Sequence, residues 1–214
     1  MYVQYGAGLQ YIQGWINYDA SPRLIFEKIW LYRLILNNYS KCIFDPQILY
    51  GDIVKGLPHA NKSVDGVFCS HVLEHLSLDD FHKAISNTFN MLKDGGRFRL
   101  IVPNLTYYVE NYLDFYHSPK SIEMTRAYKF NVETCYGRQS SRSSILKRLI
   151  EAFGNSNHLW MWDIESLKIA LEGAGFQGIS EFKKGECSDG AFLAPERDYQ
   201  FMNNAISLEC FRPK

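Results

Sequence analysis

Alternation between strand-like and helical segments is the feature of this sequence that most restricts its fold. Residues 64–70 and 97–102 are short apolar runs typical of buried strands, and the segment between them has apolar residues at helical spacing. The same order recurs along the chain, which predicts an α/β fold whose mainly parallel sheet carries helices on both faces. Further strands are expected at residues 2–5, 15–18, 48–50, 176–182 and 205–211.

Two helices are marked by capping residues. Ser77 and Asp80 form a capping-box signal, S-x-x-D, and the helix that they open is expected to stop at the paired glycines 95 and 96. Asp163 is expected to cap a later helix that Gly175 closes. Both helices therefore lie directly before a predicted strand.

A third helix is expected after Pro22. Residues 23–36 place Ile25 on a broad apolar face that Phe26 widens. A membrane-surface helix is the alternative, but the charges of Glu27 and Lys28 cancel and give no basic face. Packing of Ile25 and Phe26 into the core is the favoured interpretation.

Size and composition predict one domain that spans residues 1–214. A chain of 214 residues with 46% hydrophobic residues can bury a substantial core. Its 23 basic and 23 acidic residues balance, which disfavours nucleic acid as a partner. No apolar stretch is long enough to span a membrane, and the five cysteines are scattered, so we expect reduced thiols and a cytoplasmic location.

The glycine-rich loop Gly6-Ala7-Gly8 follows the first predicted strand. A dinucleotide-binding loop would carry a third glycine, begin a helix whose amino end faces the pyrophosphate, and place its acid about twenty residues further on. Here the third glycine is missing, the connection to the next strand is too short for a crossover helix, and Asp19 comes early. This pattern favours a ligand with a ribose but no phosphate, such as S-adenosylmethionine.

Polar residues follow other predicted strands as well. Asp52 and Ile53 come after the third strand, and Ser70 and His71 end the fourth. Because ligands of parallel sheets bind at the carboxyl ends of the strands, we expect these residues and the glycine loop to form one site.

Four motifs resemble those of the class I S-adenosylmethionine-dependent methyltransferases, in particular a small bacterial group. Residues 14–19 read G-W-I-N-Y-D and residues 63–76 read S-V-D-G-V-F-C-S-H-V-L-E-H-L. Residues 92–96 read L-K-D-G-G, and residues 102–105 read V-P-N-L. The resemblance covers most of the chain and implies a Rossmann-like, seven-stranded, mostly parallel sheet, with a lid insertion after strand five at about residues 107–157.

The resemblance also implies roles for individual residues in binding S-adenosylmethionine. Gly6 and Gly8 would pass under the methionine part and Asp19 would hold the ribose. Asp52 with Ile53 would flank the adenine. The wall nearest the sulfonium would be formed by Ser70 and His71.

Two positions depart from the family pattern. The usual L-G-C-G or L-G-S-G is Tyr5-Gly6-Ala7-Gly8 here, which should leave the pocket usable because close backbone approach depends on the glycines. An aspartate that is common after the proline of strand five is Asn104, which cannot act as a base.

His71 has two open interpretations, a general base for methyl transfer and a hydrogen-bonded wall residue.

A rival function is a zinc hydrolase, because residues 71–75 read H-V-L-E-H and inverted zinc peptidases use H-x-x-E-H. In those enzymes the motif lies on a helix, whereas here it starts at a strand end, and a third ligand is not identifiable. We expect that methyl transfer requires no metal ion and that Glu74 and His75 have structural roles. A second rival is a cofactor-binding protein without catalysis that serves in assembly or regulation.

The acceptor of the methyl group is expected to be a small molecule, and the resemblance makes a saccharide or its activated precursor the leading candidate, in surface-polysaccharide biosynthesis. Arg138 and Arg142 belong to a basic stretch that would favour a phosphorylated or carboxylated acceptor if it covers the site. His158, Trp160 and Trp162 could line an aromatic wall for a flat acceptor, although core packing is the favoured alternative. Asn104 completes the expected acceptor residues.

Overall fold

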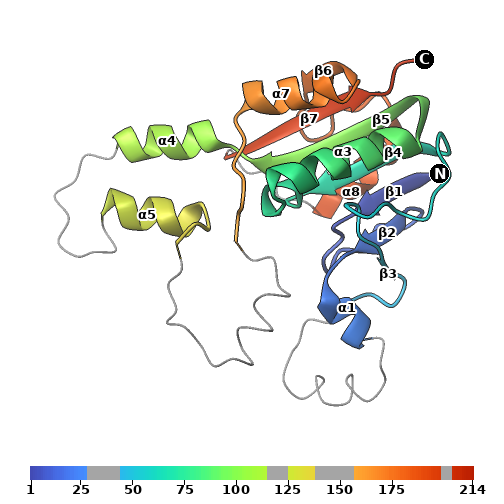
Figure 1. Cartoon of the computed structure of the whole chain (residues 1–214), viewed down its shortest axis with the longest axis horizontal. Coiled ribbons are helices and arrows are strands. Elements are labelled where there is room, and N and C mark those ends of the chain that lie inside the picture. Colours follow the sequence, from blue (N-terminus) through green and yellow to red (C-terminus); the bar gives the residue numbers. More distant parts are fainter. Residues whose placement is uncertain (28–43, 115–124, 138–156, 199–203) are drawn as a thin grey trace.

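The computed structural model describes residues 1–27, 44–114, 125–137, 157–198 and 204–214. In this part of the chain, seven strands form one sheet in the order β3-β2-β1-β4-β5-β7-β6 (Figure 1). The strands are β1 (Tyr2–Tyr5), β2 (Ile16–Asp19), β3 (Leu49–Tyr50), β4 (Val64–Ser70), β5 (Leu92–Pro103), β6 (Gln177–Glu181) and β7 (Ala205–Phe211).

The sheet is mostly parallel, as the alternation predicted. Strand β1 pairs in parallel with β2 and β4, β2 with β3, and β4 with β5. Only β7 runs against its neighbours β5 and β6 among the pairs that the structure describes. All seven expected strands are present, with bounds that match or differ by one residue except for β5, which begins five residues earlier than predicted.

Helices cover both faces of the sheet. The helical elements are α1 (Pro22–Glu27), η1 (Leu73–His75), α3 (Leu78–Met91), α4 (Leu105–Asp114), α5 (Arg126–Glu133), α7 (Ile164–Gly173), η3 (Gly190–Phe192) and α8 (Leu193–Asp198). Figure 1 shows α3 and α7 on one face and α8 on the other. None of the described helices has the length and apolar character needed to cross a membrane.

Side chains of the central strands alternate between two hydrophobic clusters. Val67 and Leu100 belong to the cluster on the side of α3 and α7, and their neighbours Phe68 and Ile101 belong to a second cluster with Phe192 of η3. All of these are buried to within 1% of full burial. Successive side chains of a strand point to opposite faces of the sheet, so these strands contribute apolar side chains to both clusters. Their sequences are therefore continuous apolar runs.

Both predicted capping residues are confirmed. The Ser77 hydroxyl accepts a hydrogen bond from the Asp80 amide at 3.2 Å, and the Asp163 carboxylate accepts one from the Ser166 amide at 2.8 Å. The predicted end of α3 is wrong, since the helix stops at Met91 and Gly95 lies within β5 with a φ of 79°. The sequence predicts helix up to Gly95 because Leu92 continues the helical spacing of Ile85 and Phe89.

The predicted packing of the helix after Pro22 is wrong where it can be seen. Ile25 and Phe26 are exposed, whereas Leu24 and Glu27 are buried. The Glu27 carboxylate accepts hydrogen bonds from the Arg23 side chain and from the Phe44 amide, the latter at 2.9 Å. These partners offset the cost of burying its charge, so the polar residue turns inward and the apolar ones outward. Residues 28–36 of this prediction lie outside the described residues.

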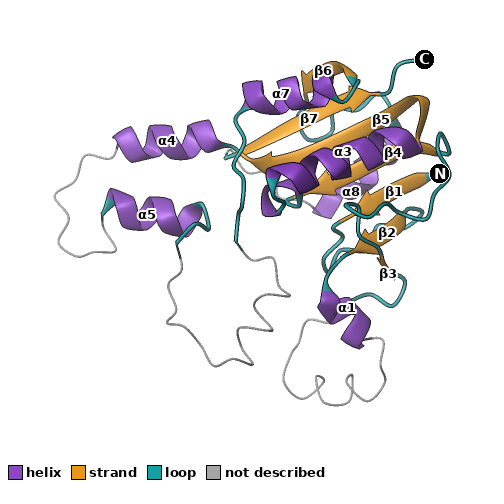
Figure 2. Cartoon of the chain, in the orientation of Figure 1, coloured by secondary structure: helices purple, strands orange, loops and turns teal. Residues whose placement is uncertain are grey.

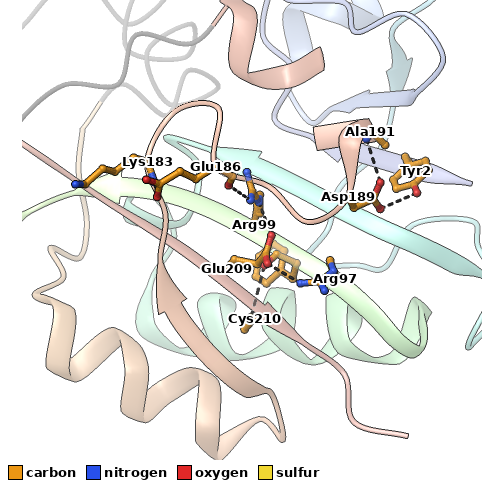
Figure 3. A network of polar contacts seen from close by, with 10 residues as sticks. Tyr2, Arg97, Arg99, Lys183, Glu186, Asp189, Ala191, Glu209 and Cys210 are labelled. Carbon is orange, nitrogen blue, oxygen red and sulfur yellow. Dashed lines mark hydrogen bonds and ion pairs between the residues drawn. The ribbon is translucent and has the colours of Figure 1, made fainter. Parts of the chain in front are cut away.

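A buried ion pair joins the antiparallel part of the sheet. Arg99 on β5 is 1% exposed, and its Nε donates to Glu209 Oε2 on β7 at 2.5 Å (Figure 3). Arg97 donates to the other carboxylate oxygen at 2.6 Å. The Arg99 guanidinium lies 4.1 Å from the ring centroid of Phe182 and also donates to the Glu186 carbonyl. The Glu209 carboxylate, the Phe182 ring and the Glu186 carbonyl together offset the cost of burying the Arg99 cation in an apolar layer.

We predict that Glu209→Ala lowers the free energy of unfolding by about 3–5 kcal/mol, because Arg99 keeps its burial and loses its counter-charge. Glu181→Ala is the control, because it removes an exposed carboxylate from the neighbouring strand β6 and should change stability by less than about 0.5 kcal/mol. Urea unfolding of both variants measures the difference. Equal stability of the two variants would show that the pair does not hold β7 in place.

Candidate cofactor and acceptor site

The predicted site residues gather at the carboxyl edge of the parallel strands. The glycine loop leaves β1, Asp19 ends β2, and Ser70 ends β4. The chain between β1 and β2 contains no helix (Figure 2). The abbreviated first crossover that the sequence predicted is therefore confirmed, and the glycine loop does not begin a helix whose amino end could bind a phosphate.

Gly6 and Gly8 need glycine for different reasons. Both have positive φ, 69° for Gly6 and 54° for Gly8. A Cβ on Gly6 would lie 2.0 Å from Cγ2 of Val72, so the loop packs directly against the segment that follows β4. A Cβ on Gly8 would meet no atom within 4 Å. The first glycine therefore permits close packing, and the second borders open space that a ligand can fill.

Asp19 ties this loop to the end of β2. It is 8% exposed, and its two carboxylate oxygens accept hydrogen bonds from the amides of Gly8 at 2.8 Å and Ser21 at 2.7 Å. Each oxygen can accept a second hydrogen bond. The early aspartate thus fixes the shape of the loop and still offers acceptor capacity for the hydroxyl groups of a ribose.

Asp52 and Ile53 lie in the turn that follows β3. Oδ1 of Asp52 accepts a hydrogen bond from the Val54 amide at 3.0 Å, and the side chain of Ile53 is buried in the main core. Asn87 of α3 donates to the Ile53 carbonyl at 2.8 Å. The turn is therefore held from both sides, and the second oxygen of Asp52 lies 3.3 Å from the Lys55 ammonium.

Ser70 and His71 form a hydrogen-bonded pair at the end of β4. His71 has a φ of 54°, which is uncommon for a residue with a side chain, and its amide donates to the Ile101 carbonyl at 2.9 Å. Its Nδ1 lies 2.9 Å from Ser70 Oγ, and the residue reaches solvent. Partial desolvation by neighbouring protein atoms, and then the nearby His75, lower the pKa of His71. The imidazole is therefore neutral and able to accept a proton at pH 7.

A cluster of three side chains, Glu74, His75 and His158, adjoins this pair. Nε2 of His75 lies 3.9 Å and Nε2 of His158 lies 4.0 Å from Oε1 of Glu74. The Glu74 carbonyl accepts hydrogen bonds from the amides of Leu159 at 2.7 Å and Trp160 at 3.1 Å, which brings the segment before α7 to η1. Among the described residues, these three form a group that could hold a metal ion, because their ligand atoms lie within 4.8 Å of one another.

Burial dominates the electrostatics of this cluster. It raises the pKa of Glu74 to about 8, and it lowers the pKa of His158 to about 4 with additional effects of His75 and His71. The pKa of His75 is lowered for the same reason. All three groups therefore favour their neutral forms, and neither histidine supplies a positive charge to the carboxylate.

The other expected acceptor residues have separate outcomes. Asn104 accepts a hydrogen bond from the Thr106 amide at 3.0 Å through its own side chain and forms a parallel bridge with Trp162. Trp162 is buried against Phe81, at 4.3 Å between ring centroids, whereas Trp160 is 41% exposed. Core packing is thus the outcome for Trp162 and not for Trp160. Arg138 and Arg142 lie outside the described residues.

Sequence reasoning missed the third member of the cluster. Motif H-x-x-E-H supplied Glu74 and His75, but 82 positions separate His75 from Asn157, the residue before His158. The position of His158 directly before an aromatic run indicates a possible acceptor residue, but it does not indicate a neighbour of Glu74. What could not be read from the sequence is that backbone hydrogen bonds bring it to η1.

Comparisons with known proteins agree with this geometry. Residues 9–181 match the family model described as a methyltransferase domain. No curated protein matches the chain in sequence. Among solved structures, an S-adenosylmethionine-dependent methyltransferase from Archaeoglobus fulgidus has a TM-score of 0.51 at 15% identity, with 99% of this chain and 85% of that chain covered.

Two further structures share the fold. One is from a complex between the Haloferax volcanii Trm112 methyltransferase activator and a methyltransferase, with a TM-score of 0.51 at 15% identity over 100% of this chain and 82% of that chain. The other is YcgJ from Bacillus subtilis, with a TM-score of 0.50 at 14% identity over 100% of this chain and 92% of that chain. These likenesses show a common fold.

The strand order, the glycine loop and the site at the carboxyl edge define a class I methyltransferase. The chain belongs to the methyltransferase-domain family, because the family model covers most of its length. It is therefore an enzyme of the methyl-transferring class, with S-adenosylmethionine as the cofactor of that class, as the sequence predicted. The zinc-hydrolase alternative is not favoured by this family match, and neither is a protein without catalysis.

We predict that Gly6→Ala destabilises the fold by about 2–5 kcal/mol, because it combines left-handed backbone strain with a collision against Val72. Val72→Ala removes the colliding methyl, so the double variant should be more stable than the sum of the two single effects by about 1–3 kcal/mol. A double-mutant cycle by urea unfolding measures this coupling. Additive effects would contradict direct packing of the loop on residue 72.

Proposed function

We propose that this protein transfers the methyl group of S-adenosylmethionine to a hydroxyl group of a small acceptor. The observation that carries the proposal is the loop with Gly8 bordering open space, tied by its amide to Asp19 at the carboxyl edge of a methyltransferase fold. A cofactor with a ribose and an amino-acid tail fits these residues, since one side offers bare backbone and the other offers carboxylate oxygens.

Each part of the cofactor has candidate partners in this chain. The backbone at Gly6 and Gly8 would border the methionine part, and the remaining acceptor capacity of Asp19 would take the ribose hydroxyls. Ile53 provides an apolar surface for adenine, with Asp52 beside it. Ser70 and His71 would line the wall nearest the methyl group. The turn and loop are already held by hydrogen bonds, so little ordering is needed on binding.

His71 is the proposed general base. If Nδ1–H donates to Ser70 Oγ, the Nε2 lone pair is available for the proton of the acceptor hydroxyl. When bound, S-adenosylmethionine supplies the methyl carbon that the acceptor oxygen attacks, and the electrons of the broken carbon–sulfur bond stay on sulfur. The remaining rate enhancement comes from holding the reactants in line.

A saccharide or its activated precursor is the proposed acceptor class, in the cytoplasm. The exposed ring of Trp160 beside His158 supports a sugar, because sugars pack their apolar faces on aromatic rings. Free cysteines 69, 135, 187 and 210 support a reducing compartment. Residues 107–157, which include α5 and most of α4, would cover the acceptor as a lid, and Arg138 and Arg142 would contact its phosphate groups.

Calorimetry with S-adenosylmethionine and its demethylated product tests the cofactor part, and Gly8→Ala makes the test specific. We predict at least about tenfold weaker binding for Gly8→Ala, equal to about 1.4 kcal/mol, because the new methyl enters the space assigned to the ligand. Gly14→Ala is the matched control, since Gly14 also has positive φ, 83°, and no neighbour within 4 Å, but lies at the amino end of β2.

The two variants should lose similar stability, about 1–2 kcal/mol from backbone strain, and differ only in cofactor binding. Equal binding by both variants would remove the loop from the site. Failure of the wild-type protein to bind either compound at millimolar concentration would overturn the proposed function itself.

We predict that His71→Asn lowers kcat by about 100-fold or more with unchanged cofactor affinity, because the base is lost while asparagine tolerates the positive φ. Single-turnover methylation of a panel of nucleotide-linked sugars, with calorimetry in parallel, separates the two effects. Unchanged kcat would make His71 a wall residue. Cofactor binding with no methylation of any panel member, by the wild-type protein, would count against a saccharide acceptor.

A further inference from the structure

Glu74 is a buried residue whose carboxyl group has no hydrogen-bond partner among the described residues. Its side chain is 0% exposed, and within the described residues neither carboxylate oxygen has a hydrogen-bond partner. The two histidine nitrogens at 3.9 and 4.0 Å are too distant for hydrogen bonds. A buried carboxyl group without partners costs several kcal/mol, so its retention calls for a ligand.

We infer that Glu74, His75 and His158 form a binding site for a divalent transition-metal ion. Two donors that each lie about 2.1 Å from one ion can be up to about 4.2 Å apart. Both carboxylate-to-histidine distances, 3.9 and 4.0 Å, fall within that limit. The full set of ligand atoms lies within 4.8 Å, so only a small rotation of one imidazole is needed to bring all three around one centre.

A hydrogen bond already orients one of the proposed ligands, and two more fix the segment that carries another. His75 Nδ1 lies 3.1 Å from the Asn157 carbonyl, to which it can donate, and its Nε2 lies 3.9 Å from Oε1 of Glu74. Metal-binding histidines usually have such a partner on the other ring nitrogen. The Glu74 carbonyl holds Leu159 and Trp160, so the same peptide that carries the carboxylate fixes the segment that carries His158.

Two imidazoles and one carboxylate suit Zn²⁺, Co²⁺ or Mn²⁺ better than Ca²⁺, which prefers oxygen ligands alone. Three protein ligands leave at least one coordination position open. The zinc-peptidase arrangement is different, because its two histidines lie on one helix, whereas here η1 has only three residues and His158 comes from another segment.

The open coordination position of the ion would face the acceptor of the methyl group. This step rests on the proposed function. His71 lies three residues before Glu74 in the same segment, and Val72 between them packs on the glycine loop. An acceptor hydroxyl bound to the ion would become more acidic. Its proton would pass to His71, and its oxygen would form the new bond to the methyl carbon. The ion would thus select acceptors that carry a hydroxyl group.

Titration of the metal-free protein with Co²⁺ and Zn²⁺, in the absence of S-adenosylmethionine, tests the site. We expect one ion per chain by calorimetry and a visible Co²⁺ spectrum of mixed nitrogen and oxygen ligands. His158→Ala and Glu74→Gln should each weaken binding at least about tenfold. His82→Ala is the control, because it removes an exposed histidine of α3 outside the cluster and should leave binding unchanged.

The proposal is overturned if the folded wild-type protein binds neither ion at millimolar concentration, or if His158→Ala binds as tightly as His82→Ala. Circular dichroism verifies that each variant folds, and His75→Ala gives a third independent removal of a ligand. Acetohydroxamate, which binds accessible ions through two oxygens, should change the Co²⁺ spectrum. An unchanged spectrum would make the site closed and structural, and would contradict its contact with an acceptor. Cofactor binding is measured separately, so failure of the metal site leaves that result standing.

Discussion

Close packing of Gly6 on Val72 is the contact on which the arrangement of the site depends. Residue 6 has no side chain, so the loop after β1 can lie against the segment after β4 with a separation that no Cβ would permit. One side of this contact leads through Gly8 to Asp19, and the other leads to His71 and Glu74. The proposed cofactor and acceptor sides therefore meet at this close contact.

Much of the fold was predictable because local chemistry and tertiary packing agree. Ser77 and Asp163 are good caps in any context, and the strands β4 and β5 are apolar on both faces because both faces are buried. Prediction was wrong at Ile25 and at the end of α3, where propensity and periodicity gave one answer and long-range contacts gave another. The partner of Glu27 is the amide of residue 44, and no local pattern reveals it.

The candidate site shows the same division. Residues at strand ends could be assigned in advance, because a parallel sheet brings those ends to one edge. Asp19 also accepts hydrogen bonds from the amides of Gly8 and Ser21. These bonds depend on turn geometry that only the structure supplies. His158 was expected beside an acceptor, but its position next to Glu74 depends on two backbone hydrogen bonds to a carbonyl 85 positions or more earlier along the chain.

The two buried ionisable residues Arg99 and Glu74 have very different surroundings in the protein interior. Arg99 is surrounded by a carboxylate, a carbonyl and an aromatic ring, which is the pattern expected of a structural ion. Glu74 is as deeply buried, yet within the described chain neither of its carboxylate oxygens has a hydrogen-bond partner, and the imidazole nitrogens of His75 and His158 lie 3.9 and 4.0 Å away. Arg99 thus has protein partners for its guanidinium, whereas the Glu74 carboxyl group has none among the described residues. The metal ion proposed above accounts for this difference, and Val72, two residues before Glu74, connects the cluster to the proposed cofactor loop.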